Sequence, residues 1–224
     1  MTMPRKVAVI GTGDIGAGWA ALCASAGWPV AIFDANSSRM EGAFEDVARR
    51  AQALVALERA PQRIVERGLH ELQQAGTLAE AVQDADWVIE AIHEDVLAKQ
   101  KLIEAIEHAA GPDALISSSS SGLTPTEIFG RVRRMDRCLV THPLNPPELI
   151  PLVEIVPEGR TSPATVARAV EYLRALGRHP IVLKKAIPGY VVGRVAAAVW
   201  RECIDLVLRG ETTVEELKRV TLHA

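Results

Sequence analysis

The sequence is poor in cysteine and carries no excess of basic charge. Its 224 residues include three cysteines, Cys23, Cys138 and Cys203, which lie far apart and form no C-x-x-C pair. This spacing argues against a disulfide framework and against a zinc site, so we expect no bound metal and a reducing, cytoplasmic environment. The net charge of −3 offers no basic surface, which disfavours nucleic acid as a partner.

Long hydrophobic runs are also absent. The most apolar late stretch, residues 190–208, is interrupted by charged residues, so we expect no membrane span. The five residues before the first apolar run leave no room for a signal peptide. Hydrophobic residues make up 48% and charged residues 24% of the chain, which is typical of a globular protein. The length allows one large domain with a small appendage.

The chain begins with the order strand, glycine turn, helix and second strand over residues 6–34. The turn follows an apolar run directly and has the spacing G-x-G-x-x-G. Its first glycine permits the tight turn, the second lets the backbone approach a pyrophosphate, and the third allows close contact between helix and strand. The free N–H groups of the helix N-terminus favour the same anion. The cofactor-binding residues predicted from this dinucleotide turn are Gly11, Gly13, Ile15 and Gly16.

The second strand of this segment ends on an acid, Asp34. A carboxylate at this position accepts hydrogen bonds from the ribose diol of an adenosine and repels a 2′-phosphate. No arginine immediately follows it. The sequence therefore predicts NAD, rather than NADP, as the cofactor.

Strands and helices alternate along the rest of the chain, which predicts an α/β fold with a Rossmann-type, doubly wound and mainly parallel sheet. A helix predicted over 39–60 and a second helical piece after Pro61 are longer than an ordinary crossover. They form either a solvated hairpin or a lid or docking surface for a bulky substrate group. We expect a dinucleotide-binding domain over 1–186, followed by the first helices of an incomplete all-α domain over 187–224.

Polar residues at the ends of predicted strands are candidates for chemistry. Oxidation of an alcohol requires a base that accepts the hydroxyl proton while a hydride is transferred to nicotinamide. Histidine suits the role of this base, because its unperturbed pKa lies near neutrality, and His142 is the candidate. Glu154 is the carboxylate that would orient the imidazole and stabilise its charged form. Ser121 and Asn145 can hold the reacting oxygen and the nicotinamide. From spacing alone, a loop histidine and a serine run at a polar strand end remain alternatives.

Several motifs, in order and covering essentially the whole chain, resemble the 3-hydroxyacyl-CoA dehydrogenase family. Each of them lies at or near the end of a predicted strand or the start of a helix. They are the glycine turn, E-A-I-x-E at 90–94, S-S-S-S at 118–121, H-x-x-N-P at 142–146, L-V-E at 152–154, and P-G-Y at 188–190 with Arg194.

The resemblance implies roles for individual residues. It makes His142 the catalytic base and Glu154 its partner, and it makes Ser121 a ligand of the substrate and of the nicotinamide ribose. It also implies that the NAD contacts include Asp34, Glu94, Lys99 and Asn145.

Within the family, the segments 142–147 and 151–154 look most like the branch of gulonate 3-dehydrogenase (lambda-crystallin) and carnitine dehydrogenase. The tripeptide at 200–202 is similar to that of the carnitine enzymes. Members of this branch act on free 3-hydroxy acids. The resemblance therefore implies a small free 3-hydroxy acid as the substrate, with a 3-hydroxyacyl-CoA thioester as the alternative.

The chain departs from the family pattern in two ways. Gly193 stands where the family usually has Asn or Asp, so one polar group near the substrate oxygen is absent. Family members also continue into a larger helical domain. The helix predicted over 190–208 has apolar residues around much of its circumference, so we expect a homodimer or larger assembly through residues 190–222, with weak or no activity of the chain alone.

Two other functions are compatible with these residues. One is an NAD-binding protein with little turnover. The other is an enzyme of the β-hydroxyacid dehydrogenase type, which uses a catalytic lysine. Lys184 and Lys185 precede the long helix, whereas that type places its lysine inside the helix, so the second alternative fits less well.

Overall fold

The computed structural model describes residues 3–223, with side chains described for residues 3–220. The chain divides into two compact units, Met1–Pro188 and Gly189–Ala224. Each unit is described by itself below.

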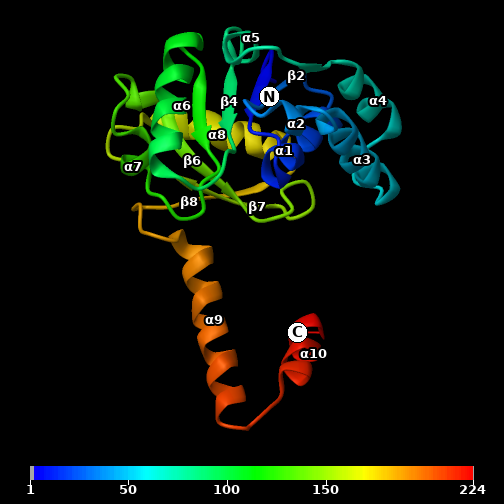
Figure 1. The fold of residues 1–224 in the computed structure, drawn as a ribbon, viewed down its shortest axis with the longest axis vertical. Helices are drawn as coiled ribbons and strands as arrows, with labels where there is room; N and C mark the ends of the chain where they lie inside the picture. The colour runs from blue at the N-terminus through cyan, green and yellow to red at the C-terminus, as the bar shows by residue number, and fades with distance from the viewer. Residues whose placement is uncertain (1–2, 224) are drawn as a thin grey trace. The chain divides into compact units, whose positions relative to one another are not determined.

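The first unit is built on one eight-stranded sheet with the order β3-β2-β1-β4-β5-β6-β7-β8 (Figure 1). The strands from β3 to β6 are parallel, β7 runs antiparallel to β6, and β8 is parallel to β7. This arrangement confirms the predicted Rossmann-type, mainly parallel sheet. The strands are β1 (Val7–Ile10), β2 (Val30–Phe33), β3 (Leu72–Gln74), β4 (Trp87–Glu90), β5 (Leu115–Ser118), β6 (Cys138–Pro143), β7 (Leu152–Val156) and β8 (His179–Val182).

Helices cover both faces of the sheet (Figure 1). Helices α1, α3 and α4 contact one another, and α5 and α7 both contact α6. The helices of this unit are α1 (Asp14–Ser25), α2 (Ser37–Met40), α3 (Ala43–Ala56), α4 (Gln62–His70), α5 (Leu78–Val82), α6 (Val96–Ala109), α7 (Pro125–Phe129) and α8 (Pro163–Ala175), with a 3₁₀ turn at Met135–Arg137.

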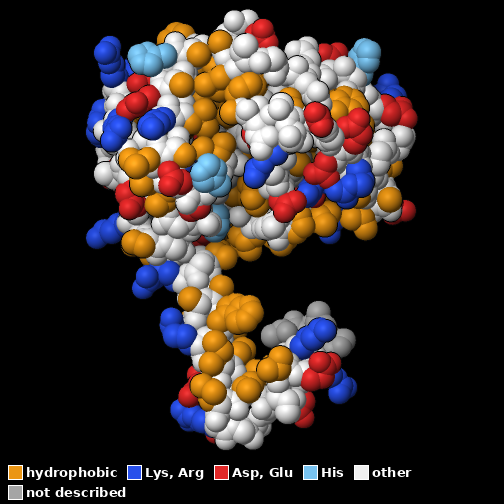
Figure 2. All heavy atoms as spheres, in the orientation of Figure 1, with side chains coloured by type: hydrophobic (Ala, Val, Ile, Leu, Met, Phe, Trp, Pro, Cys, Tyr) orange, Lys and Arg blue, Asp and Glu red, His pale blue; other side chains and the backbone are white. Residues whose placement is uncertain are grey.

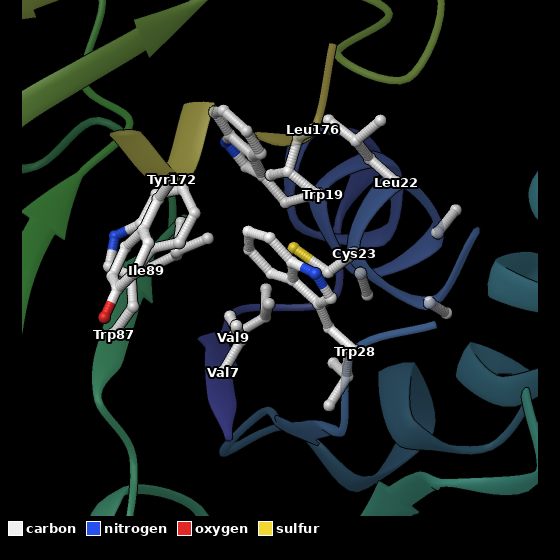
Figure 3. Packing of buried hydrophobic residues seen from close by; sticks show 14 of the residues in the cluster. Val7, Val9, Trp19, Leu22, Cys23, Trp28, Trp87, Ile89, Tyr172 and Leu176 are labelled. Atoms are coloured by element: carbon white, nitrogen blue, oxygen red, sulfur yellow. The ribbon is translucent and has the colours of Figure 1, made fainter. Parts of the chain in front are cut away.

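The core under α1 and α8 is aromatic (Figure 3). The ring centroid of Trp87 on β4 lies 5.8 Å from that of Trp19 on α1 and 5.7 Å from that of Tyr172 on α8. Trp28, which follows α1, packs edge-on against Tyr172. Aromatic pairs at these separations contribute about 0.5–1.5 kcal/mol each beyond the apolar area they bury. The contacts fix α1 and α8 on the same face of the sheet.

The single helix expected over 39–60 is wrong. Helix α2 ends at Met40, and α3 runs only over Ala43–Ala56. Gly42 between them has φ 135°, which is outside the helical region. Glycine adopts this φ without the steric penalty that other residues would have, so the helix is interrupted here. The second helical piece, α4, ends at His70, and residues 72–74 form the edge strand β3.

The second unit consists of α9 (Tyr190–Leu208) and α10 (Val214–His223). A groove of about 580 Å³ runs between them, and apolar side chains gather along both helices in Figure 2. No helix among residues 3–223 is long and apolar enough to cross a bilayer. The residues lining the groove are Val199, Trp200, Cys203, Ile204, Val207, Leu208, Val214, Leu217 and Lys218.

Close packing of α4 on α1 depends on Gly68. A Cβ built at Gly68 would overlap the backbone carbonyl of Ala24 on α1. This carbonyl belongs to a helix whose residues 16–25 are all buried, so it cannot shift easily. The small residue is therefore needed where the two helix backbones approach.

We expect Gly68→Ala to lower the free energy of unfolding by about 1–3 kcal/mol, the usual effect of overpacking. In an open helix the same change would stabilise by up to about 1 kcal/mol. Urea unfolding followed by tryptophan fluorescence measures the effect. Gly159→Ala is the control, because a Cβ at Gly159 meets nothing within 4 Å. Equal stability of the two variants would contradict the proposed packing.

Candidate functional site

The glycine turn after β1 is shaped for close backbone approach. Gly11 has φ 100°, and a Cβ there would lie 2.6 Å from the carbonyl oxygen of Ala91. A Cβ at Gly16 would overlap the carbonyl of Gly11. Around Gly13, in contrast, the sole atom near a Cβ position in the described part of the chain is Nη1 of Arg39, at 3.6 Å. The turn thus leaves room at the N-terminus of α1, where a pyrophosphate fits.

Asp34 directly follows β2 and lies beside this turn. Its carboxylate accepts hydrogen bonds from the backbone N–H groups of Thr12, at 3.0 Å, and Asn36, at 2.9 Å. These bonds fix the carboxylate at the rim of a cavity of about 360 Å³, a size that suits one nucleoside. The donor and acceptor groups present therefore fit an adenosine. The cavity is lined by Ile10, Gly11, Phe33, Asp34, Ala35, Asn36, Arg39, Ile92, His93 and Leu102.

A buried ion pair lies at the end of β4. Glu90 is 0% and Lys99 1% exposed, and Lys99 Nζ lies 2.7 Å from Glu90 Oε1. The ammonium also donates to the carbonyl of Ile92, and the same Glu90 oxygen accepts from the Ile92 N–H. The other carboxylate oxygen of Glu90 accepts from the hydroxyl of Ser118. Breaking a buried pair of this kind costs about 3–5 kcal/mol.

Glu94, on the loop between β4 and α6, lies at the surface above Lys99. Burial opposes its ionisation, but hydrogen bonds from the Ser120 hydroxyl and the Gly122 N–H, together with the Lys99 charge, lower the pKa of Glu94 below its usual range. The carboxylate is ionised at neutral pH and is held rigidly. The roles of Glu94 and Lys99 as NAD contacts remain predictions, and the structure places Lys99 behind Glu94.

Four hydroxyls of the serine run serve the fold. Ser117 accepts from the Trp87 indole N–H at 2.9 Å, and Ser119 accepts from that of Trp19 at 3.1 Å. Ser118 and Ser120 bind the two glutamates described above. Ser121, the residue selected from the sequence, is exposed at the end of this run. Its position is compatible with a ligand contact.

His142 and Glu154 are brought together by the antiparallel pairing of β6 with β7. They are cross-strand partners, and Nδ1 of His142 lies 2.8 Å from Oε2 of Glu154. The Glu154 side chain is 1% and the His142 side chain 12% exposed. Asn145 lies in the loop after β6, is itself exposed, and precedes a cis peptide bond to Pro146. The carboxylate can thus hold the imidazole in one orientation while the ring reaches the surface.

Comparison with known proteins identifies the family of the chain. Residues 6–186 match the family described as "3-hydroxyacyl-CoA dehydrogenase, NAD binding domain". The chain belongs to the 3-hydroxyacyl-CoA dehydrogenase family. Its membership confirms the predicted family, and with it NAD as the cofactor of the Rossmann domain.

Relatives within the 3-hydroxyacyl-CoA dehydrogenase family point to one branch. An L-carnitine dehydrogenase of Burkholderia mallei is 41% identical over 214 residues, which are 94% of this chain and 64% of the relative. A lambda-crystallin homolog of Mus musculus is 34% identical and shares 90% of this chain and 63% of its own length. The chain thus spans less than two thirds of these relatives. The branch expected from residues 142–154 is confirmed.

A solved structure of the same fold is that of 5-formyl-3-hydroxy-2-methylpyridine 4-carboxylic acid 5-dehydrogenase, described as an NAD+-dependent dismutase. It superposes with a TM-score of 0.90 at 32% identity and covers 99% of this chain and 71% of the other. The likeness confirms the dehydrogenase fold.

Sequence reasoning gave no role to Glu90, to Glu148 or to the tryptophans that bind the serines. Glu148 is 4% exposed, accepts a hydrogen bond from Arg50 Nη1 at 2.9 Å, and lies against Gly18 of α1. A signal was present for Glu90, because an acid at the end of the apolar strand Trp87–Glu90 must find a buried partner. Nothing in the sequence pattern identifies Lys99 as that partner.

We expect the unmodified protein to bind NADH more tightly than NADPH and Asp34→Ala to reduce that preference by about tenfold, because two hydrogen bonds to the ribose and the repulsion of a 2′-phosphate are lost. Fluorescence titration with both cofactors measures the ratio. Asp84→Ala, an exposed acid before β4, is the control. Equal or tighter NADPH binding by the unmodified protein would refute the role of Asp34.

Proposed function

We propose that this chain is the cofactor-binding and catalytic part of an NAD-dependent dehydrogenase that interconverts a 3-hydroxy and a 3-keto group. The residues that do the work are His142 as general base, Glu154 as its partner, and Ser121 and Asn145 as ligands of the reacting oxygen and the nicotinamide. The observation that carries the proposal is the 2.8 Å contact between His142 Nδ1 and the buried carboxylate of Glu154.

The contact with Glu154 selects a tautomer of His142. An ionised carboxylate accepts a hydrogen bond, so Nδ1 carries the proton and Nε2 presents its lone pair to the substrate. In the oxidation direction, Nε2 takes the proton of the 3-hydroxyl group, the C–O bond becomes a carbonyl, and the hydrogen on C3 leaves as hydride. NAD+ supplies the hydride acceptor when bound. Glu154 then stabilises the imidazolium by its charge.

A free 3-hydroxy acid such as carnitine or gulonate is the substrate class we favour. The support is the 41% identity to a protein named L-carnitine dehydrogenase and the similarity to lambda-crystallin homologs. A 3-hydroxyacyl-CoA is the alternative, because the family is defined by that substrate. An NAD-binding protein with little turnover is a third possibility. We also propose a cytoplasmic location, which the small, odd number of widely spaced cysteines supports.

We expect His142→Ala to lower turnover by on the order of 10²–10⁴-fold, the usual contribution of a positioned base. Glu154→Gln should also slow turnover, because it removes the charge that stabilises the imidazolium. NADH formation is followed by absorbance over a panel of free 3-hydroxy acids and 3-hydroxyacyl-CoAs.

His108→Ala is the matched control, because this residue lies in the last turn of α6, away from β6 and β7. NADH affinity should stay unchanged in all three variants. Near-normal rates for both His142→Ala and Glu154→Gln would refute the assignment of His142 as the general base. Turnover of the thioesters alone would reject the free acid, and no turnover with tight NADH binding would favour the third alternative.

We also propose that the protein forms a homodimer through α9 and α10. Apolar side chains on α9 are unusually exposed: Val195 is 59%, Trp200 69%, Ile204 54% and Leu208 80% exposed. An apolar surface of this extent is typical of an association site. Leu222, which was expected to contribute, has its side chain outside the described residues.

If this surface joins two copies, Ile204→Glu should convert the dimer to a monomer, because a charge cannot be buried there unpaired. Arg201→Glu introduces the same side chain on the polar face of α9 and should leave the dimer intact. Light scattering at tens of micromolar protein measures the mass. A stable monomer of the unmodified protein would contradict the proposal.

A further inference from the structure

A second cavity lies in the first unit, at the opposite end of α1 from the glycine turn. It has a volume of about 500 Å³, within the range of small-molecule sites. The 12 residues of α1 span roughly 18 Å, so the cavity is separate from the cofactor turn. Most of the residues that line it are apolar. They comprise Leu22, Ala26, Leu54, Ala60, Pro61, Leu149, Pro151, Ala175, Leu176 and Gly177, with Ser25, Arg59 and Arg178.

Two arginines supply positive charge to this cavity. Arg59 Nη1 donates to the carbonyl of Leu149 at 2.7 Å. Arg178 Nη1 donates to the carbonyls of Pro147, at 3.2 Å, and Ile150, at 3.3 Å. Among the side chains described, neither guanidinium lies within 4.0 Å of a carboxylate oxygen. Burial and the neighbouring charge of Arg59 both lower the pKa of Arg178 below its ordinary value.

Ser25 adds a buried polar group to the same walls. The residue is 6% exposed, and its hydroxyl has no hydrogen-bond partner in the part of the chain that the structure describes. Buried hydroxyls are normally satisfied, and each orphan requires an explanation. The Ser25 oxygen itself is covered by the protein, so the two arginines, and not Ser25, are the polar groups that the cavity offers to a ligand.

We propose that this cavity binds a small organic carboxylate with an apolar chain. The planar forks of guanidinium groups match carboxylate oxygens, and an anion between Arg59 and Arg178 relieves the repulsion of two like charges. The leucine and proline walls require an apolar body, because a bare inorganic anion would leave them unmatched. No residue of the cofactor turn or of the His142–Glu154 pair lines the cavity, so this site is independent of the proposed dehydrogenase function.

Isothermal titration calorimetry with hexanoate tests the proposal, with inorganic phosphate and 1-hexanol as comparison probes. We expect hexanoate to bind in the presence of saturating NADH, and to bind at least tenfold more tightly than either probe. If phosphate binds as tightly as hexanoate, the ligand does not need an apolar chain and the proposal is wrong. If 1-hexanol binds as tightly, the ligand does not need a negative charge, and the proposal is also wrong. If NADH abolishes hexanoate binding, the two ligands compete, and the cavity is not a site separate from the cofactor site.

Variants locate the binding. Arg59→Gln should weaken hexanoate binding by about tenfold or more, the usual effect of a lost charge-assisted hydrogen bond. Arg63→Gln removes the same charge from an exposed position of α4 outside the cavity and should leave affinity unchanged. Ala60→Phe should abolish binding by filling the cavity, with thermal unfolding confirming that each variant is folded. Equal affinity of the Arg59 and Arg63 variants, or full binding by Ala60→Phe, would refute the site.

Discussion

The fully buried carboxylate of Glu90, at the end of β4, must find hydrogen-bond and charge partners among the elements at the carboxyl ends of the parallel strands. Glu90 has no contact with solvent, so each of its oxygens needs a partner inside the protein. Lys99 of α6 supplies the charge, and Ser118 at the end of β5 supplies a hydroxyl. These bonds tie three elements together and place Glu94 directly over the buried ammonium. The loop after β4 is therefore anchored at Ile92 and Glu94, the segment for which an NAD contact is predicted.

Reversal of chain direction at β7 creates the candidate catalytic pair. In a purely parallel sheet, residues at the ends of successive strands approach from one edge only. Because β7 returns antiparallel to β6, Glu154 sits directly opposite His142 and can be buried while the imidazole reaches the surface. The proposed general base and its partner thus come from a two-stranded ladder, which holds them more precisely than a loop would.

The loop between these two strands connects the candidate catalytic pair to the rest of the unit. Its start carries Asn145, and its middle residue Glu148 binds Arg50 and lies against Gly18 of α1. The carbonyls that follow are held by Arg59 and Arg178, which also form the charged wall of the second cavity. The segment of eight residues between β6 and β7 is thereby fixed by Arg50 of α3 and by two arginines of loops, Arg59 before α4 and Arg178 before β8.

The sequence by itself determined the Rossmann fold, the glycine turn and the acid at Asp34, because these depend on local order: an apolar run, three glycines at fixed spacing, and a strand end. It also placed His142 and Glu154 among the candidates and proposed them as a pair, but from spacing alone a loop histidine remained an alternative. The tertiary structure alone decided which buried groups meet. The pairing of Glu90 with Lys99 and the convergence of Arg59 with Arg178 join residues that share no local pattern, since long-range packing and the burial of charge select such partners.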